Sequence, residues 1–246
     1  MIKNYLKTIF LKIISIARSE KIILRIYRTY PSDPCELSEI REKLNALSNR
    51  AGVKPPTLYT TDLPLPGSFI IGKNPNETAL VFPKRLLNLM NPDQIEAMLA
   101  HDLVQINDNI GIRTFAAMFA SLMTMSASAI RWGAVFTGFG DYNDPAPKMF
   151  GTFVMGLVAP PAAALVQTVA KEEYDAKAAE LCRDTDKLIQ AIENLEKNNI
   201  TGYPSIGFLC LVDPQKEFLF EELFNSHPSR ETRVKILIGM GRTTFQ

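Results

Sequence analysis

Apolar residues recur every third or fourth position in two stretches of the first half of the chain, a spacing typical of helices with one buried face. They predict a helix over residues 35–50 that ends near Ala51-Gly52, and a second helix that begins at Asn91. The two stripes are Leu37, Ile40, Leu44 and Leu47, and Ile95, Leu99, Leu103 and Ile106. Asn91 is expected to cap the second helix, with Pro92 at the first helical position and Asp93 complementing the helix dipole.

Between these helices the pattern changes to short runs rich in β-branched and aromatic residues, separated by proline and glycine. The runs are Thr57–Thr61, Ser68–Ile71 and Thr78–Phe82, and they predict a small antiparallel sheet. An edge strand of such a sheet could hold an extended peptide by backbone pairing. Farther along, helical patterning covers Val169 to about Lys197, and a last helix begins near Ser229. The expected fold class is α+β and mainly helical.

Two long apolar segments carry no charge. Thr114–Ile130 contains seventeen residues and Met149–Ala170 contains twenty-two. Crossing a bilayer takes about 20 apolar residues, so the second segment meets this length and the first approaches it. Pro160-Pro161 would kink the second segment. Such prolines suit a membrane helix with neighbours, a re-entrant segment or a soluble apolar segment.

Residues 1–30 carry seven basic residues against Glu20 alone, interleaved with apolar residues. This pattern predicts a basic amphipathic helix that lies in the interface of an anionic leaflet, because no uncharged run is long enough to cross the bilayer. The alternative is a helix packed on its own domain. A signal peptide is disfavoured, since lysine interrupts the apolar core and no small-residue cleavage site follows.

Composition limits the compartment and the partners. The 246 residues are 46% hydrophobic, which is compatible with a real core, and their net charge is +1. The cysteines Cys35, Cys182 and Cys210 are dispersed, which fits a reducing compartment and argues against a thiolate metal site. Basic residues gather near the N-terminus, so the surface domain is expected on the cytoplasmic side of the cytoplasmic membrane. No glycine loop that cradles phosphate is present, and neither nucleotide nor nucleic acid is an expected partner.

The segment His101-Asp102-Leu103-Val104-Gln105 reads as an altered H-E-x-x-H motif. In the intact motif two histidines share one helix face and bind Zn²⁺, while the glutamate polarises a water molecule. Here the Gln105 amide replaces the second imidazole and is a poor zinc ligand. Asp102 is one methylene shorter than glutamate, which would misplace the base. Because Asp102 lies within the apolar arc of its helix, it is either a relic of the catalytic position or a hydrogen-bonded structural group.

Four stretches of the chain resemble known motifs in the same order. Gly67–Gly72 is similar to N-A-F-A-x-G, and Asp93–His101 is similar to D-E-L-x-A-V-L-A-H. Glu173–Lys177 is similar to E-Y-x-A-D, and His227-Pro228 with Arg233 is similar to a late H-P…R element. Together they resemble the HtpX-like family of membrane zinc metallopeptidases, which are relatives of the CAAX prenyl endopeptidases. The resemblance covers roughly residues 37–237, and the ordered combination is more specific than any single piece.

The resemblance implies a zincin-like metallopeptidase domain formed by residues 31–111 and 171–246, interrupted by a transmembrane helical hairpin in residues 112–170, with residues 1–30 at the membrane surface. It also implies roles for six residues. The metal positions are His101, Gln105 and Glu173, and the catalytic positions are Asp102, His227 and Arg233.

Lys177 replaces the aspartate of the family pattern, and its spacing from Glu173 favours an ion pair within one helix. Two interpretations of this pair remain open. The ammonium group partly replaces the missing metal charge in a buried site, or the pair is exposed and contributes little.

Two functions compete. In the leading hypothesis the protein is a membrane-anchored homologue without efficient hydrolysis and without a required cofactor, which contacts membrane lipids and binds a membrane protein, a peptide or a partner complex. In the alternative it is an active zinc metalloendopeptidase of membrane protein quality control, with Zn²⁺ held by His101, Glu173 and either Gln105 or His227. A transporter or channel component has little support, because the two apolar segments contain no acid or base to mark a pathway.

Overall fold

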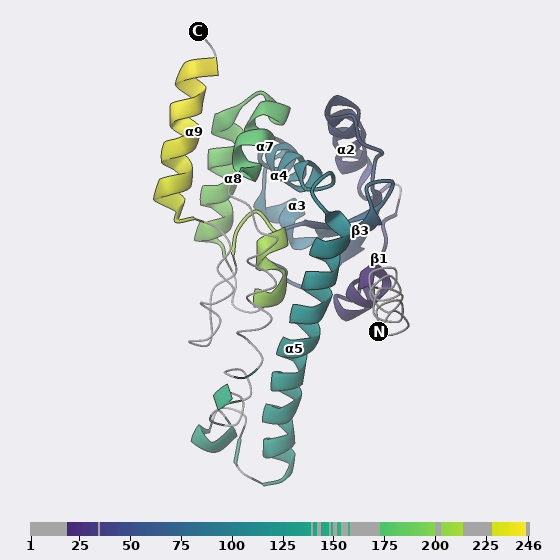
Figure 1. The fold of residues 1–246 in the computed structure, drawn as a ribbon, viewed down its shortest axis with the longest axis vertical. Coiled ribbons are helices and arrows are strands. Elements are labelled where there is room, and N and C mark those ends of the chain that lie inside the picture. The colour runs from purple at the N-terminus through teal and green to yellow at the C-terminus, as the bar shows by residue number, and fades with distance from the viewer. Residues whose placement is uncertain are drawn as a thin grey trace, which may run out of the picture.

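The computed structural model combines packed helices with one small sheet, and one long helix extends away from them (Figure 1). It describes residues 19–33, 35–138, 140–141, 144–147, 149, 152–153, 157, 173–199, 203–213 and 228–244. The helices are α2 (Ser38–Ala51), α3 (Arg85–Leu89), α4 (Pro92–Val104), α5 (Ile110–Phe136), α7 (Tyr174–Cys182), α8 (Thr185–Lys197), the 3-10 helix η1 (Pro204–Leu209) and α9 (Arg230–Thr244). The strands are β1 (Tyr30–Pro31), β2 (Thr57–Thr61), β3 (Phe69–Asn74) and β4 (Glu77–Pro83).

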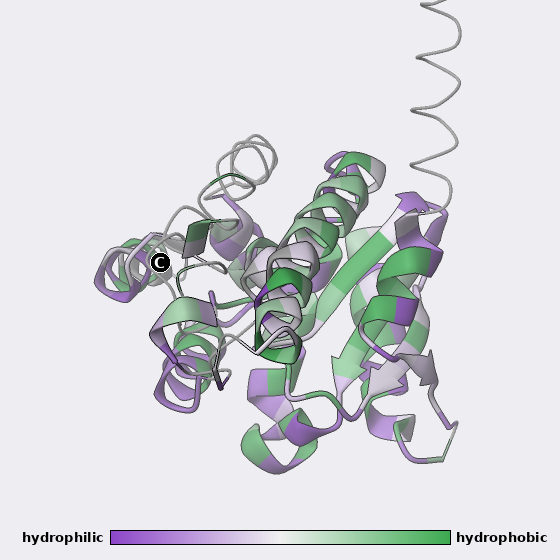
Figure 2. Cartoon of the chain, turned by 90° about the horizontal axis from the view of Figure 1, so that it is seen from below, coloured by the Kyte–Doolittle hydropathy of each residue, from purple (hydrophilic) through white to green (hydrophobic). Residues whose placement is uncertain are grey.

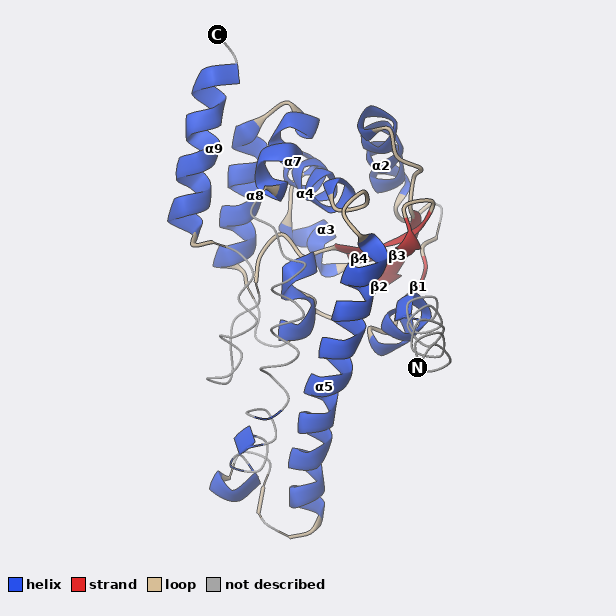
Figure 3. Ribbon diagram, in the orientation of Figure 1, coloured by secondary structure: helices blue, strands red, loops and turns tan. Residues whose placement is uncertain are grey.

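The four strands form a mixed sheet in the order β1-β2-β4-β3 (Figure 3). β1 is antiparallel to β2 and β3 is antiparallel to β4, but β2 and β4 run parallel. The prediction of a purely antiparallel sheet is therefore wrong, although β2 has the predicted bounds and β3 and β4 overlap the other two predicted runs. Apolar patterning identifies strand residues, whereas the direction of pairing depends on where the connections carry the chain.

The two faces of the sheet have separate hydrophobic clusters, because successive residues of a strand point to opposite faces. Ile70 and Phe82 belong to the cluster formed with α2, α4, α7 and α8. Phe69 and Val81 belong to the cluster formed with α5, η1 and the helix through residues 19–26. Seen from below, the sheet is coloured mainly as hydrophobic and lies between helices (Figure 2). The helix with the altered motif and the long helix α5 thus lie on opposite faces.

The starts and ends of the expected helices are confirmed where the local signals are strong. α2 ends at Gly52, which has the left-handed conformation (φ +66°) that glycine adopts readily. α4 begins with Asn91 as the cap, and the Asn91 side chain accepts from the backbone of Asp93 and Gln94. The Gln94 side chain reaches back to the backbone of Asn91, which completes a capping box.

The helical patterning expected from Val169 to about Lys197 is divided between two helices, α7 and α8, in the described part of this range. Arg183 adopts a left-handed conformation (φ 61°) and ends α7. Asp184 then caps α8 by accepting from the backbone N–H groups of Asp186 and Lys187. The aspartate cap begins a new helix two residues after the first ends, so the apolar spacing continues while the helix axis changes.

α5 is long and apolar enough to cross a membrane by length and composition. It includes the first predicted segment and extends past it at both ends, so Arg113 and Arg131 both lie inside the helix. Its first half packs against β3 and η1, and its second half projects beyond the domain (Figure 1). Most of the second predicted segment, Met149–Ala170, lies outside the described residues. The hairpin and the division into domains therefore stay predictions.

The described part of the N-terminal segment packs on the domain. Ile23 and Tyr27 are buried, and the Tyr27 hydroxyl bonds to Ser121 Oγ at 2.9 Å and to Ser205 Oγ at 3.1 Å. These contacts join the segment to α5 and η1. Residues 1–18 lie outside the described part, so the membrane-surface helix stays a prediction.

Candidate functional site

The altered motif faces the interior of the protein. His101, Asp102 and Gln105 all lie at or just beyond the last turns of α4, and none exposes more than 1% of its surface. Gln105 Nε2 lies 3.3 Å from His101 Nδ1, so the residues at positions i and i+4 do share one face. This juxtaposition is what the H-E-x-x-H spacing predicts.

Both ends of the Gln105 amide are engaged. Its nitrogen donates to the backbone oxygen of Leu209 at 3.2 Å and to that of His101 at 3.3 Å. Its oxygen accepts from Arg113 Nη2 at 2.7 Å. The oxygen that would have to face a metal ion therefore already faces a guanidinium group.

Arg113 comes from the first turn of α5 and is fully buried. Besides Gln105 it donates to the Tyr174 hydroxyl at 2.7 Å and to the backbone oxygen of Phe208 at 3.2 Å. The guanidinium carbon lies 4.8 Å from the centre of the Tyr174 ring and 5.6 Å from that of Phe208. Oxygen acceptors and the faces of aromatic rings are both favourable surroundings for a guanidinium group.

Tyr174 connects this cation to a carboxylate. Its hydroxyl donates to Asp108 Oδ2 at 2.5 Å. Burial raises the pKa of Tyr174, so the hydroxyl keeps its proton and can act as this donor at neutral pH. Arg113 and Asp108 are thus linked through one phenol group.

Asp102 lies on the same helix but turns toward the sheet. Its Oδ2 accepts a hydrogen bond from Ser68, just before β3. Its Oδ1 lies 3.9 Å from His101 Nδ1 and has no hydrogen-bond partner among the described residues. Burial raises the pKa of Asp102 well above the ordinary value, and the bond from Ser68 opposes this only in part. This direction favours the protonated carboxyl group, which cannot accept a proton as a general base.

A second arginine lies on the other side of His101. Arg233 of α9 binds both oxygens of Asp175 at 2.6 and 2.7 Å and donates to the backbone oxygen of Leu211 at 2.8 Å. Asp175 Oδ1 is 4.0 Å from His101 Nε2. Arg233 is thus connected to the motif through Asp175. Sequence reasoning missed Asp175, although it lies inside the Glu173–Lys177 segment that carried part of the resemblance.

Glu173 and Lys177 form their ion pair on the outside of the protein. Lys177 Nζ lies 3.1 Å from Glu173 Oε2, with 54% and 71% of the two side chains exposed. The pair is therefore exposed, which is the second of the two interpretations, and it is expected to contribute little to stability. Among the described residues no three His, Cys, Asp or Glu side chains are grouped closely enough to hold a metal ion. His227 lies outside the described residues.

Comparison with known proteins places this chain in a family. The model of peptidase family M48 matches residues 34–240. The chain belongs to peptidase family M48. A protease HtpX homolog of Desulfatibacillum aliphaticivorans is 33% identical over 231 residues, which cover 90% of this chain and 74% of that protein. A protease HtpX homolog of Pelotomaculum thermopropionicum is 30% identical over 246 residues, covering 96% of this chain and 88% of that protein.

The crystal structure of Ste24p from S. mikatae is similar to this M48 chain at 17% identity with a TM-score of 0.48. The match covers 94% of this chain and 57% of the Ste24p chain.

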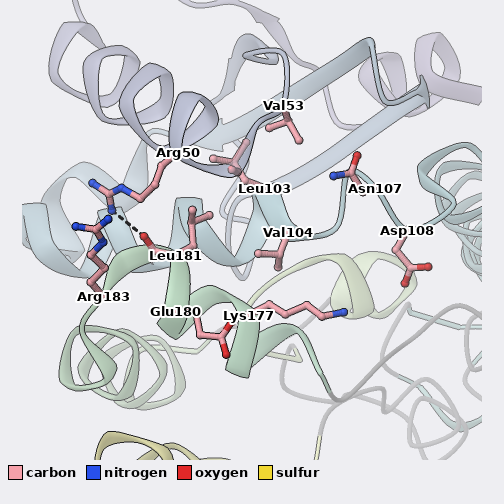
Figure 4. Close-up of a pocket in the computed structure, with 11 residues that line it drawn as sticks. Arg50, Val53, Leu103, Val104, Asn107, Asp108, Lys177, Glu180, Leu181 and Arg183 are labelled. Carbon is pink, nitrogen blue, oxygen red and sulfur yellow. Dashed lines mark hydrogen bonds between the residues drawn. The ribbon is translucent and has the colours of Figure 1, made fainter. Parts of the chain in front are cut away.

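The M48 chain has an open groove beside the motif helix, between α2, α4 and α7 (Figure 4). The cavity measures about 570 Å³, within the size range of sites for small ligands and short peptide segments. Its lining residues are Arg50, Ala51, Val53, Leu103, Val104, Asn107, Asp108, Lys177, Glu180, Leu181 and Arg183. Arg50 and Arg183 lie together at one end, where Arg50 donates to the backbone oxygen of Leu181 at 2.7 Å (Figure 4).

Proposed function

We propose that this protein is a membrane-anchored M48 homologue that acts by binding a membrane protein or peptide, without efficient peptide hydrolysis. In this proposal His101–Gln105 stands where catalytic members have H-E-x-x-H. The observation that carries it is the 2.7 Å hydrogen bond from Arg113 to the oxygen of Gln105. A cation fixed on the second motif position opposes the binding of a second, divalent cation there.

Two other carboxylates near the motif, Asp175 and Glu173, are also engaged. Arg233 binds both oxygens of Asp175, the described carboxylate that approaches His101 Nε2. Glu173 lies at the exposed start of α7, paired with Lys177. Zinc in proteins requires three or four converging N, O or S ligands. The described residues do not fit such a centre.

Binding needs an accessible surface, and the groove between α2, α4 and α7 supplies one. Apolar side chains of Val53, Leu103 and Val104 line it, with Arg50 and Arg183 at one end. α5 supports the anchoring part of the proposal, because its projecting half exposes large apolar side chains. Anchoring on the cytoplasmic side, with membrane lipids around α5, completes the proposed arrangement.

The alternative is an active zinc endopeptidase, and membership in a peptidase family favours it. One experiment separates the two. The full chain is purified in detergent, zinc per chain is measured, and cleavage of an unfolded protein substrate is followed with and without added zinc. We expect no stoichiometric zinc and no cleavage. About one zinc per chain, abolished by Glu173→Ala, would reject the proposal in favour of the enzyme.

The binding part has its own test. A photo-reactive side chain replaces Val53 in the groove, and a matched chain carries it at Leu87, an exposed residue of α3. We expect a discrete protein adduct in membranes from position 53 only. Equal labelling from both positions would remove the groove from the proposal.

A further inference from the structure

The cations around the motif differ sharply in burial. Arg113 is fully buried and Arg233 is 2% exposed, whereas 54% of the Lys177 side chain is exposed. A buried cation is tolerated only where acceptors and counter-charges compensate for the lost water. A cation that replaces the charge of a metal ion must therefore be sought in the interior, and Lys177 does not qualify.

Arg113 lies in a cage made by three separate elements. Gln105, following α4, supplies a side-chain oxygen, Tyr174 of α7 supplies a hydroxyl oxygen, and Phe208 of η1 supplies a backbone oxygen, at 2.7, 2.7 and 3.2 Å. The guanidinium group also lies over the aromatic faces of Tyr174 and Phe208. The planar guanidinium matches several fixed acceptors at once, which a spherical ammonium group does less well.

Among the described residues, each of the two buried arginines near the motif is linked to a carboxylate. Arg113 is linked through Tyr174 to Asp108, and Arg233 is paired directly with Asp175. Arg113 and Arg233 thus each have a carboxylate among the residues that the structure describes. A divalent metal ion beside His101 and Gln105 would add two positive charges within a few ångströms of the Arg113 guanidinium group.

We infer that Arg113 is a resident cation that occupies the second motif position in place of a metal ion and keeps divalent metal from His101. This inference rests on the proposed function and names the group responsible for it. If the altered motif alone prevented zinc binding, Gln105→His would restore it. If Arg113 prevents it, Gln105→His leaves the chain unable to hold zinc until Arg113 is also replaced.

The test compares zinc content and zinc affinity of full chains purified in detergent. The variants are Gln105→His, Gln105→His with Arg113→Met, and Gln105→His with Lys177→Ala. The last is the matched control, because it removes a cation that lies outside the cage. Thermal unfolding in zinc-free buffer shows which chains are folded. A further variant, Gln105→His with Arg113→Gln, is prepared alongside, because glutamine keeps a hydrogen-bond donor toward Tyr174. It is used for the comparison if the variant with Arg113→Met does not fold.

We expect the double variant without Arg113 to bind zinc at least about 100-fold more tightly than Gln105→His alone, since removing a like charge near the metal is worth several factors of ten. The Lys177→Ala control should match Gln105→His. Equal zinc binding with and without Arg113, including none in either, would overturn the inference. So would equal gains from Arg113→Met and Lys177→Ala. Stoichiometric zinc in the unaltered chain would instead overturn the proposed function itself.

Discussion

At the residue scale, the ion pair between Asp175 and Arg233 joins α7 to α9 beside His101. Asp175→Asn keeps the side-chain shape but leaves the buried Arg233 without its counter-charge. We expect the free energy of unfolding to fall by about 3–5 kcal/mol, the usual cost of breaking a buried pair by removing one partner. Urea denaturation of the detergent-purified chain measures this change.

Lys177→Ala is the control, because it breaks an ion pair that lies on the surface. It is expected to change the free energy of unfolding by no more than about 1 kcal/mol. Similar losses from Asp175→Asn and Lys177→Ala would show that burial does not set the value of these pairs.

Asp102 should make stability depend on pH. Burial raises its pKa, so the folded chain keeps this proton to a higher pH than the unfolded chain does. The stability contributed by the bound proton is complete below the ordinary carboxyl pKa and is lost as pH rises toward the folded pKa, at up to about 1.4 kcal/mol per pH unit. Asp102→Asn removes this titration.

The measurement is the free energy of unfolding of both chains at about pH 5 and about pH 7. The difference between Asp102→Asn and the unaltered chain is expected to shift in favour of the variant at the higher pH. Parallel curves for the two chains would show that Asp102 keeps the same pKa in the folded and unfolded states.

At the scale of elements, the junction between α7 and α8 contains a strained residue. Arg183 ends α7 with φ 61°, a conformation that costs a residue with a Cβ about 1 kcal/mol. Arg183→Gly should therefore raise the free energy of unfolding by up to about 1 kcal/mol. Arg183→Ala loses the same side chain but keeps the Cβ, so it should bring no gain. If Arg183→Ala raised the free energy of unfolding as much as Arg183→Gly, the gain would come from removing the arginine side chain and not from relieving backbone strain.

The same junction shows which parts of the fold the sequence determines locally. The capping residues of α4 and the glycine after α2 act within one turn, and both helices appear where their signals are. Asp184 is an equally local signal, but the apolar spacing continued across it and hid the break. The parallel pairing of β2 and β4 has no local signal at all, because it depends on the path of the chain between them.

The candidate site divides in the same way. The closeness of His101 and Gln105 follows from helix geometry and was predictable. Arg113 directly precedes the uncharged segment Thr114–Ile130, and nothing in its neighbours along the chain indicates that its side chain contacts Gln105. Two of the residues that it contacts, Tyr174 and Phe208, lie 61 and 95 positions farther along the chain. Contacts of this range require the tertiary structure.

At the scale of the whole molecule, the projecting half of α5 is the feature with the most direct bearing on the membrane. Four of its exposed apolar residues follow one stripe at helical spacing, Leu122, Met125, Trp132 and Phe136, and Ile130 is exposed on another face. Phe136 is 83% exposed. Exposing an apolar surface of this kind to water is unfavourable. The chain contains a single tryptophan, and it lies in this stripe, so its fluorescence reports on the surroundings of the projecting half without any label.

Trp132 is therefore expected to emit at shorter wavelength in lipid vesicles than in water, and lipids with brominated acyl chains should quench it, because the indole ring would lie among or beside those chains. The control is a chain with Trp132→Phe and Ile112→Trp, which moves the only indole to an exposed position at the domain end of α5, about 30 Å away along the helix. Its quenching should be much weaker. Equal quenching at both positions would mean that the helix lies flat on the bilayer, whereas quenching of neither by brominated lipid would exclude α5 as the anchor.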